Sequence, residues 1–256
     1  MRILAIGDVV GNIGLEHLAK NLWRVRNENK IDFCVVNGEN ASEISGLCRA
    51  DAMKIFDAGA DVITLGNHTW GRRDLHELLD QNENIIRPAN FVPGLPGSGY
   101  TIAMVQGYRV LCINLIGTIN MESESSPFLA VDKILKSEEG EYDVAVVDFH
   151  AETTSEKIAM GWYLDGRASL VFGTHTHVQT ADERVLPNGT AYITDLGMSG
   201  PMNGVLGVSA DIIIKRLTTH MPERFIVAGG DVKAHGIIAD VDASSGKAIS
   251  IKRITF

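Results

Sequence analysis

The chain has 256 residues, of which 45% are hydrophobic and 21% are charged, so it is long and apolar enough to bury a substantial core. Lys and Arg total 23 against 32 Asp and Glu, and the net charge of -9 argues against a protein that grips long nucleic acid or an anionic membrane through a basic face. The three cysteines form no CxxC pair, no apolar run approaches the roughly 18 residues of a membrane span, and Asp8 interrupts the N-terminus before a signal peptide. We expect a cytoplasmic globular protein, built as a single domain over residues 1–256.

Five short apolar runs rich in Val and Ile predict strands that are buried on both faces of a sheet. They lie at residues 3–6, 33–36, 62–65, 144–147 and 170–172. Apolar residues at helical spacing separate the first three runs, and these runs recur about one βαβ unit apart along the chain. The first three strands are therefore expected to run parallel.

Two further stretches predict β-hairpins, one over residues 100–115 around Gln106-Gly107 and one over residues 236–254 around Ser245-Gly246. Parallel units combined with hairpins imply mixed sheets. Residues 210–217 predict a helix despite their run of β-branched residues. The polar, turn-rich residues 121–128 predict a mobile loop.

Residues of the metal-ligand type follow each of the five predicted buried strands. In an open α/β sheet the carboxyl ends of parallel strands line one crevice, so these residues are expected to converge although they are far apart in sequence. A glycine precedes most of them, which permits a sharp turn and a close approach of a ligand. The residues are Asp8, Glu39, Asn67, His150, His175 and His177.

These six oxygen and nitrogen donors, with no thiolate, are more than one tetrahedral ion needs and suit two divalent ions that share a carboxylate. Such a pair can hold a hydroxide as nucleophile and clamp a phosphate. Each residue alone also has a structural reading: Asp8 as a helix cap, Asn67 in a turn and His150 as a core histidine. The joint pattern favours the metal site.

The chain has no GxGxxG, P-loop or GxSxG motif, and His235 receives no role. His17, His76 and His220 are interpreted as surface residues on helices.

The ordered blocks GDVVGNIG, NGENA, GNHTW, GTHTHVQTAD and YITDLGMSGP resemble those of the calcineurin-like metallophosphoesterases, and within them the YmdB-type 2',3'-cyclic-nucleotide 2'-phosphodiesterases. The resemblance covers the whole chain. It implies an α/β fold in which two mixed β-sheets form a sandwich flanked by helices, in four αββα layers. The chain departs from the broad superfamily because Val10 replaces the histidine of the usual DxH block and Glu39 replaces an aspartate, and the YmdB-type group shares both departures.

Carried onto this chain, the resemblance implies a ligand set and a catalytic residue. Asp8, Glu39 and His177 would hold one ion. Glu39 would bridge to the second ion, which would also be held by Asn67, His150 and His175. His68 is similar to the family's catalytic histidine, which acts as a general acid without binding metal. Asn40 would help to orient the phosphate or the hydroxide.

The function that follows is metal-dependent hydrolysis of 2',3'-cyclic nucleotides to 3'-nucleotides, by attack of a metal-bridging hydroxide with His68 as general acid. Phosphomonoesters or 3',5'-cyclic nucleotides stay open as alternative substrates, and a nucleotide-sensing regulatory protein as an alternative of another class. The cofactors would be two divalent ions, with Fe or Mn favoured over Zn, Co or Mg. A small-molecule nucleotide is the expected partner, neither long nucleic acid nor a membrane is expected, and a homo-oligomer stays open.

Overall fold

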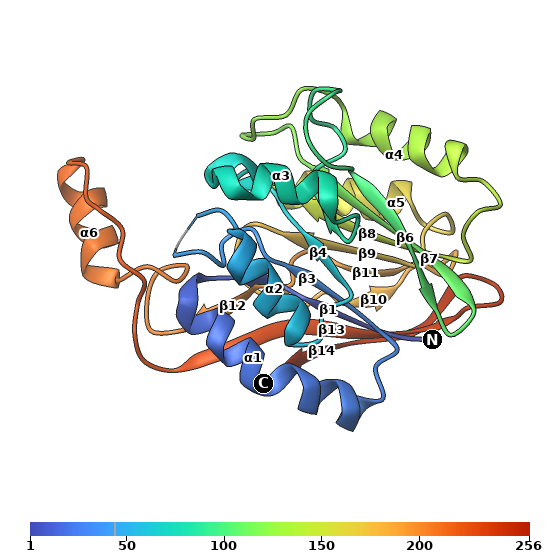
Figure 1. Ribbon diagram of the computed structural model, residues 1–256, viewed down its shortest axis with the longest axis horizontal. Helices are drawn as coiled ribbons and strands as arrows, with labels where there is room; N and C mark the ends of the chain where they lie inside the picture. The colour runs from blue at the N-terminus through green and yellow to red at the C-terminus, as the bar shows by residue number, and fades with distance from the viewer. Residues whose placement is uncertain (44) are drawn as a thin grey trace.

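The computed structural model describes residues 1–43 and 45–256, whose strands form two mixed sheets with helices packed against them (Figure 1). At the centre of the first sheet, β1 (Arg2–Ile6), β3 (Phe33–Asn37) and β4 (Val62–Thr64) run parallel. The eight strands follow the order β2-β12-β13-β1-β3-β4-β5, and β14 pairs with β13. The other strands of this first sheet are β2 (Asp8–Val9), β5 (Ile85–Ile86), β12 (Met198–Pro201), β13 (Val232–Asp242) and β14 (Lys247–Thr255).

The second sheet has six strands in the order β10-β11-β9-β8-β7-β6. Strands β7, β8, β9 and β11 run parallel, whereas β6 and β10 pair antiparallel at the two edges. The bounds are β6 (Tyr100–Val105), β7 (Tyr108–Ile116), β8 (Val144–His150), β9 (Leu170–Thr174), β10 (Arg184–Val185) and β11 (Ala191–Ile193). Both predicted hairpins are confirmed, as β6–β7 and β13–β14.

The described residues form six α-helices and one 3-10 helix. They are α1 (Gly11–Asn29), α2 (Arg49–Asp57), η1 (Thr69–Gly71), α3 (Arg73–Gln81), α4 (Pro127–Ser137), α5 (Thr154–Tyr163) and α6 (Ala210–Thr219). Helix α6 confirms the helix predicted over residues 210–217; none of its residues is buried, and it projects away from the sheets (Figure 1). None of the helices in the described ranges has both the length and the apolar character that crossing a bilayer requires.

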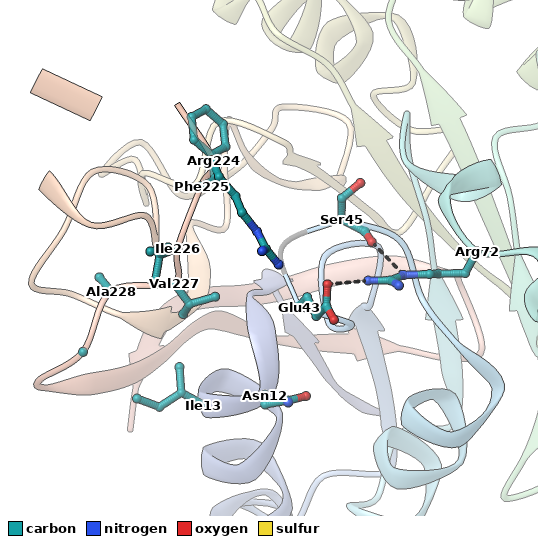
Figure 2. A pocket seen from close by; sticks show the side chains of 11 residues that line it. Asn12, Ile13, Glu43, Ser45, Arg72, Arg224, Phe225, Ile226, Val227 and Ala228 are labelled. Atoms are coloured by element: carbon teal, nitrogen blue, oxygen red, sulfur yellow. Dashed lines mark hydrogen bonds and ion pairs between the residues drawn. The ribbon is translucent and has the colours of Figure 1, made fainter. Parts of the chain in front are cut away.

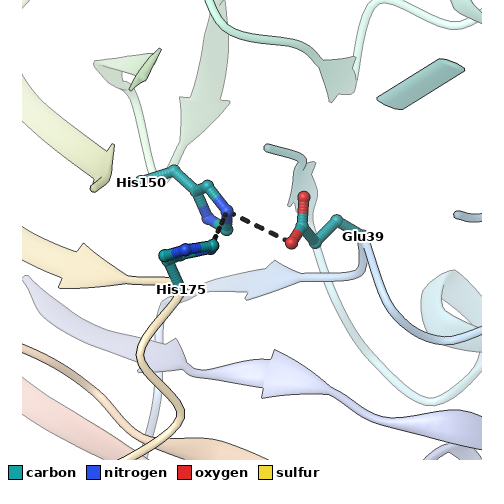
Figure 3. A group of neighbouring side chains, drawn as sticks. All are labelled: Glu39, His150 and His175. Atoms are coloured by element: carbon teal, nitrogen blue, oxygen red, sulfur yellow. Dashed lines mark hydrogen bonds and ion pairs between the residues drawn. The ribbon is translucent and has the colours of Figure 1, made fainter. Parts of the chain in front are cut away.

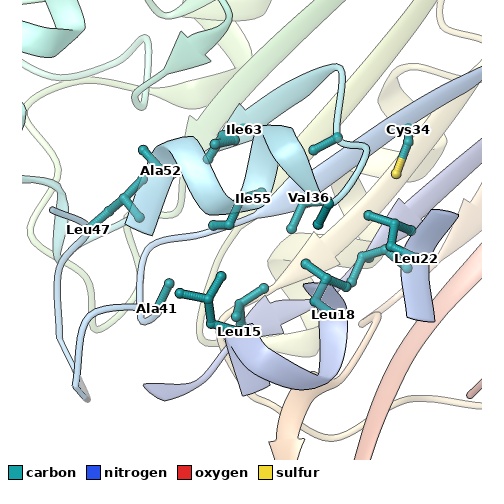
Figure 4. Close-up of a cluster of buried hydrophobic side chains, with 14 of the residues drawn as sticks. Leu15, Leu18, Leu22, Cys34, Val36, Ala41, Leu47, Ala52, Ile55 and Ile63 are labelled. Atoms are coloured by element: carbon teal, nitrogen blue, oxygen red, sulfur yellow. The ribbon is translucent and has the colours of Figure 1, made fainter. Parts of the chain in front are cut away.

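The fold has four layers, with helices outside each of the two sheets, and three clusters of buried apolar side chains hold these layers together. Alternate residues of β1 point to opposite faces, so Ile3 and Ala5 face the second sheet whereas Leu4 and Ile6 face the helices. The outer face of the first sheet packs against α1, α2 and α3 (Figure 4), and the outer face of the second packs against α4 and α5. Burial on both faces explains the continuous apolar runs, and the predicted αββα sandwich is confirmed.

Helix α1 begins just after the short strand β2 in the sequence. Its apolar stripe at Leu15, Leu18 and Leu22 is buried against the first sheet. Gly11, at a φ of 66°, donates its N–H to Asn40 O over 2.9 Å. A Cβ at this glycine would lie 2.6 Å from the carbonyl oxygen of Glu43, so the close contact and the left-handed backbone both favour glycine. The contact fixes the segment that follows β3 against the start of α1.

Four sequence interpretations need correction. Strand β8 does not end before Asp148 but continues to His150, because β7 and β9 extend its ladder on both sides. His76 is not a simple surface residue on α3, because its ring packs edge-on against Trp70 at a centroid distance of 5.4 Å. His17 on α1 is partly buried through a contact with Phe256, and His220 lies just beyond the end of α6.

Candidate functional site

Side chains of the metal-ligand type meet at the carboxyl ends of the central strands of both sheets. They come from the segments that follow β1, β3 and β4 in the first sheet and from the ends of β8 and β9 in the second. Parallel strands deliver their carboxyl ends to one edge, as the sequence pattern requires. The residues brought together are Asp8, Glu39, Asn67, His150, His175 and His177.

A tight cluster surrounds the imidazole of His150, and we call Glu39, Asn67, His150 and His175 the His150 group. The Nε2 atom of His150 lies 3.1 Å from Glu39 Oε1, 2.9 Å from Asn67 Oδ1 and 3.1 Å from His175 Nδ1. Figure 3 shows His150, at the end of β8, and Glu39 and His175, from the segments that follow β3 and β9, pointing toward one another. Donor atoms around one ion at about 2.1 Å are separated by roughly 3–3.5 Å, so this spacing fits a shared cation.

Gly66 leaves the space that this cluster occupies. A Cβ atom at Gly66 would overlap both Glu39 Oε2 and His150 Nε2. Any residue with a side chain would therefore displace a donor of the His150 group. The overlap gives a physical reason for the glycine in the Gly66-Asn67-His68 sequence.

The remaining two donors, Asp8 and His177, lie further apart, and we call them the Asp8 pair. His177 Nε2 is 3.7 Å from Asp8 Oδ1, which is beyond a hydrogen bond. Asp8 Oδ2 accepts the backbone N–H of His175 over 3.1 Å, whereas Asp8 Oδ1 is buried and has no hydrogen-bond partner among the described residues. A buried carboxylate oxygen without a donor is costly, and a cation at this position would satisfy it.

His68 and Asn40 lie at the border of the donor cluster. The His68 backbone N–H donates to Glu39 Oε2 over 3.1 Å, and its Nε2 lies 3.3 Å from Asn67 Nδ2. Asn40 Nδ2 donates to Glu39 Oε1 and to His177 Nε2, both over 3.2 Å. The Asn40 amide thus bridges the His150 group and the Asp8 pair.

Burial and neighbouring charges shift the pKa values of the site in opposite directions. Burial raises the pKa of Asp8. Burial also acts to raise the pKa of Glu39, but the facing His150 and His68 groups outweigh it and lower this pKa to about 2. Burial acts to lower the pKa of His150, yet Glu39 and Asp8 raise it to about 9, while burial and His150 lower the pKa of His175 to about 3. The buried Asp8 carboxylate ionises more readily with added positive charge nearby, which a cation supplies.

The three histidines are oriented by bonds from the ring nitrogens that face away from the donor cluster. His150 Nδ1 lies 2.9 Å from Thr174 Oγ1, and His175 Nε2 lies 2.9 Å from a carboxylate oxygen of Glu152. His177 Nδ1 donates to the carbonyl oxygen of Leu206 over 3.2 Å. When the outer nitrogen carries the proton, the inner nitrogen keeps its lone pair, as a metal-binding imidazole requires.

The Thr174 hydroxyl sets the direction of the bond to His150. Thr174 Oγ1 donates its single proton to Asp148 Oδ1 over 2.7 Å, so toward His150 it acts as an acceptor. Asp148 is fully buried and also accepts from Asn37 Nδ2 over 3.1 Å. Asp148 and His150 are two residues apart on β8 and therefore point to the same face. Asp148 thus positions Thr174 behind His150.

The loop that carries His175 and His177 has an uncommon backbone. Both histidines have positive φ angles, 95° and 63°, which side-chain-bearing residues rarely adopt. Between them, Thr176 donates its hydroxyl to Asp195 Oδ2 over 2.7 Å, and Lys157 Nζ donates to the same oxygen over 2.6 Å. Lys157 and Asp195 are each only 1% exposed. This buried ion pair holds the histidine loop in place.

Four of these supporting residues were not predicted from the sequence as part of the site: Asp148, Glu152, Lys157 and Asp195. Asp148 had a sequence signal, since it directly follows the strand predicted over residues 144–147 and precedes His150 by two residues. Asp195 lies in the YITDLGMSGP block, which contributed only to the resemblance. Nothing local marks Lys157 or Glu152. His235 on β13 lies outside the donor cluster, beside Gly197.

A cavity of about 760 Å³ lies between the start of α1 and residues 224–229 (Figure 2). Among the residues that the structure describes, its lining includes none of the six donors. Arg72 points to Glu43, which it contacts at 3.2 Å, and donates to the carbonyl oxygen of Ser45. The charge of Arg72 is therefore already paired with Glu43. Because none of the six donors lines this cavity, it is separate from the candidate metal site.

The fold and the donor cluster define an enzyme of the metallophosphoesterase class. A 5'-nucleotidase precursor from Thermus thermophilus shares the fold, with a TM-score of 0.60 at 13% identity over 100% of this chain and 54% of that one. The family model described as YmdB-like protein matches residues 4–254. The chain belongs to the YmdB-like family.

Two similar proteins align with the chain over nearly its full length. A 2',3'-cyclic-nucleotide 2'-phosphodiesterase of Bacillus subtilis (strain 168) is 46% identical over 254 residues, which cover 99% of this chain and 96% of the relative. The crystal structure of a phosphatase from Mycoplasma pneumoniae has a TM-score of 0.94 at 31% identity and covers 100% of this chain and 93% of that one. The predicted family and the prediction of an enzyme are confirmed.

Proposed function

We propose that the chain, acting as one domain over residues 1–256, hydrolyses 2',3'-cyclic nucleotides to 3'-nucleotides. The similarity to the Bacillus subtilis phosphodiesterase supports the substrate class. The observation that carries the proposal is the orientation of the three histidines. Their outer nitrogens are bonded to acceptors, while the inner nitrogens of His150 and His177 face Glu39 and Asp8 and that of His175 faces His150.

The donor residues fit two divalent cations. Asp8 and His177 would hold one ion and the His150 group the other, and Glu39 would contact both. When bound, such ions supply a water-derived nucleophile at neutral pH and positive charge for the phosphate. We propose Fe or Mn as the metals, because the donors are carboxylate, amide and imidazole groups without a thiolate; Zn, Co and Mg are the alternatives.

The chain's own residues supply the remaining chemistry. Water forms one new bond to phosphorus, and the bond from phosphorus to O2' breaks. His68 gives the proton to O2', which leaves the phosphate on O3', and the proton that the attacking water releases returns His68 to its acid form. The hydrogen bond from the backbone N–H of His68 to Glu39 holds this histidine in position. Asn40, whose amide lies between the two groups of donors, orients a phosphate oxygen.

The first experiment identifies the substrate and the product. The metal-loaded chain is incubated with 2',3'-cyclic AMP, 3',5'-cyclic AMP and p-nitrophenyl phosphate, and the products are separated by chromatography. We expect the highest kcat/KM on 2',3'-cyclic AMP, with 3'-AMP as product. Formation of 2'-AMP, or faster turnover of either other substrate, would contradict the proposal. Tight nucleotide binding without turnover would instead indicate a nucleotide-sensing protein.

The second experiment tests the general acid. His68→Ala should lower kcat by about a hundredfold or more while both metal ions are retained. His220→Asn is the matched control, because His220 is exposed and has a φ of 58°, which asparagine tolerates. Full turnover by His68→Ala with its metals intact would rule out this residue as the acid.

We also propose that the protein works in a reducing compartment, the cytoplasm. Its three cysteines all carry free thiols. Cys34 and Cys112 are buried in strands of different sheets, and burial raises the pKa of both. Such thiols are inert core residues, and the absence of disulfides is typical of cytosolic proteins.

A further inference from the structure

A small cavity opens directly beside the donor cluster. Its volume is about 170 Å³, below the roughly 300 Å³ at which sites for whole drug-sized ligands begin. Asn67, a member of the His150 group, forms part of its wall. The lining residues are Asn67, Trp70, Phe91, Val92, Leu95, Glu122 and Glu124. The cavity therefore has room for part of a substrate whose phosphate lies at the donor cluster.

One wall of this cavity is aromatic and firmly held. The rings of Trp70 and Phe91 adjoin, with centroids 5.9 Å apart and planes inclined by 39°. His76 packs edge-on against Trp70, which also packs on the outer core of the first sheet. The two rings contact one another, so a flat ligand would lie against them rather than between them.

Trp70 and His68 belong to the same short turn. Gly71 N–H donates to His68 O over 2.9 Å, and the buried Thr69 hydroxyl donates to Gly66 O over 2.6 Å. These bonds close the turn between β4 and α3. The aromatic wall is thus fixed relative to the proposed general acid.

The other wall carries two carboxylates on an anchored loop. Glu122 and Glu124 are exposed and lie in the loop between β7 and α4. The buried Asn90 side chain ties this loop to the segment that carries Phe91, because its Nδ2 donates to Ser125 O over 2.9 Å and to Ile116 O over 2.8 Å. The carboxylates therefore face the cavity from a defined position.

We propose that this cavity binds the base of a cyclic nucleotide and prefers bases with an exocyclic amino group. The inference rests on the proposed function. Every base has a flat face that stacks on an aromatic side chain. Carboxylates accept hydrogen bonds from the exocyclic amino groups of adenine, cytosine and guanine, whereas uracil offers them only its N3–H, which lies between two carbonyl oxygens that repel a carboxylate. The same carboxylates repel the phosphate, which leaves it at the donor cluster.

The kinetic test compares the four 2',3'-cyclic nucleotides on the metal-loaded chain. We expect kcat/KM for the uridine compound to be about tenfold below the other three. Trp70→Leu should raise KM for 2',3'-cyclic AMP about tenfold with a smaller change in kcat. The double variant Glu122→Gln/Glu124→Gln should narrow the gap between the uridine compound and the others, because an amide can donate to O4.

A binding test separates this inference from the proposed function. Adenosine, which has no phosphate, should quench the tryptophan fluorescence of the wild-type chain. Trp70→Leu should abolish the quenching. Trp23→Leu is the matched control and should keep it, since Trp23 is 53% exposed on α1 and donates to Asp57 O rather than lining the cavity.

The outcomes distinguish the two claims. Turnover of all four nucleotides with kcat/KM within twofold, and an unchanged KM in Trp70→Leu, would overturn the base site and leave the phosphodiesterase proposal standing. No turnover on any 2',3'-cyclic nucleotide, combined with quenching that depends on Trp70, would overturn the proposed reaction but support a base site. Quenching by adenosine that survives in Trp70→Leu would also overturn the base site.

Discussion

The His150 group and the Asp8 pair occupy one edge of the sandwich but are supported differently. In the His150 group, donor atoms already lie 2.9–3.1 Å from the central His150 nitrogen, and His150 itself sits in a buried strand between two neighbours. In the Asp8 pair, one carboxylate oxygen has no partner among the described residues, and the nearest His177 nitrogen lies 3.7 Å from it.

The His150 group is therefore preorganised by direct contacts, whereas the Asp8 pair is not. A preorganised set of ligands loses less freedom when it binds, so its affinity is higher. We therefore expect the first equivalent of metal to bind at the His150 group and the second, more weakly, at the Asp8 pair. Four substitutions, in order of decreasing expected effect, test this comparison.

His150→Ala should have the largest effect, because it removes the atom that contacts three other donors. Loss of an outer hydrogen-bond partner already costs about 10–100-fold in metal affinity or activity, and the loss of a donor should exceed this. We expect turnover below detection and fewer than two ions per chain in elemental analysis. Two tightly held ions in this variant would show that His150 is not central to the site.

Lys157→Met should act on both parts at once, because Lys157 supports the loop that carries His175 and His177. The change leaves Asp195 buried without its counter-ion, which typically costs about 3–5 kcal/mol of stability. Urea unfolding of the metal-free protein measures this loss. Lys20→Met, at an exposed position of α1, is the control and should be neutral within about 0.5 kcal/mol.

Metal titration extends this test to the histidine loop. If the ion pair only stabilises the fold, Lys157→Met should bind both ions with wild-type affinity whenever it is folded. Weaker binding of both ions in the folded variant is what a positioning role predicts.

Asp8→Asn should affect mainly the Asp8 pair. The amide oxygen of Asn can still accept the His175 N–H, but the charge for the ion is lost. We expect one ion per chain and a fall in kcat of about a hundredfold, equivalent to ~2.7 kcal/mol. Loss of both ions would mean that the two parts of the site are not independent.

Leu217→Ser should have the smallest effect. Leu217 is 69% exposed on α6, a helix without buried residues. Surface changes of this kind stay within about 0.5 kcal/mol of the wild-type stability, and neither metal content nor turnover should move. A large change in turnover would place α6 in the catalytic unit.

Much of the architecture was predictable, because strands that are buried on both faces appear in the sequence as continuous runs of apolar residues. Glu39 and His175 were identified for a related reason: a polar residue directly after such a strand is a local signal. The partners of these donors were not predictable in the same way. Lys157 meets Asp195 across 38 residues, and only the packing of α5 on β9 and β11 brings them together. The left-handed backbone of His175 and His177 likewise depends on tertiary contacts to Thr176, since sequence preference alone argues against it.

The position of β1 in its sheet has a consequence for how the protein is made. β1 precedes Asp8 and lies between β3 and β13, with Ile6 paired to Gly236. One edge of β1 therefore stays open during synthesis until residues 232–242 have left the ribosome. Domains of this size begin to collapse while they are still being translated, and unpaired strand edges are prone to aggregation. β1 is translated long before its partner β13, so early termination of translation would release a sheet in which one side of β1 is unpaired.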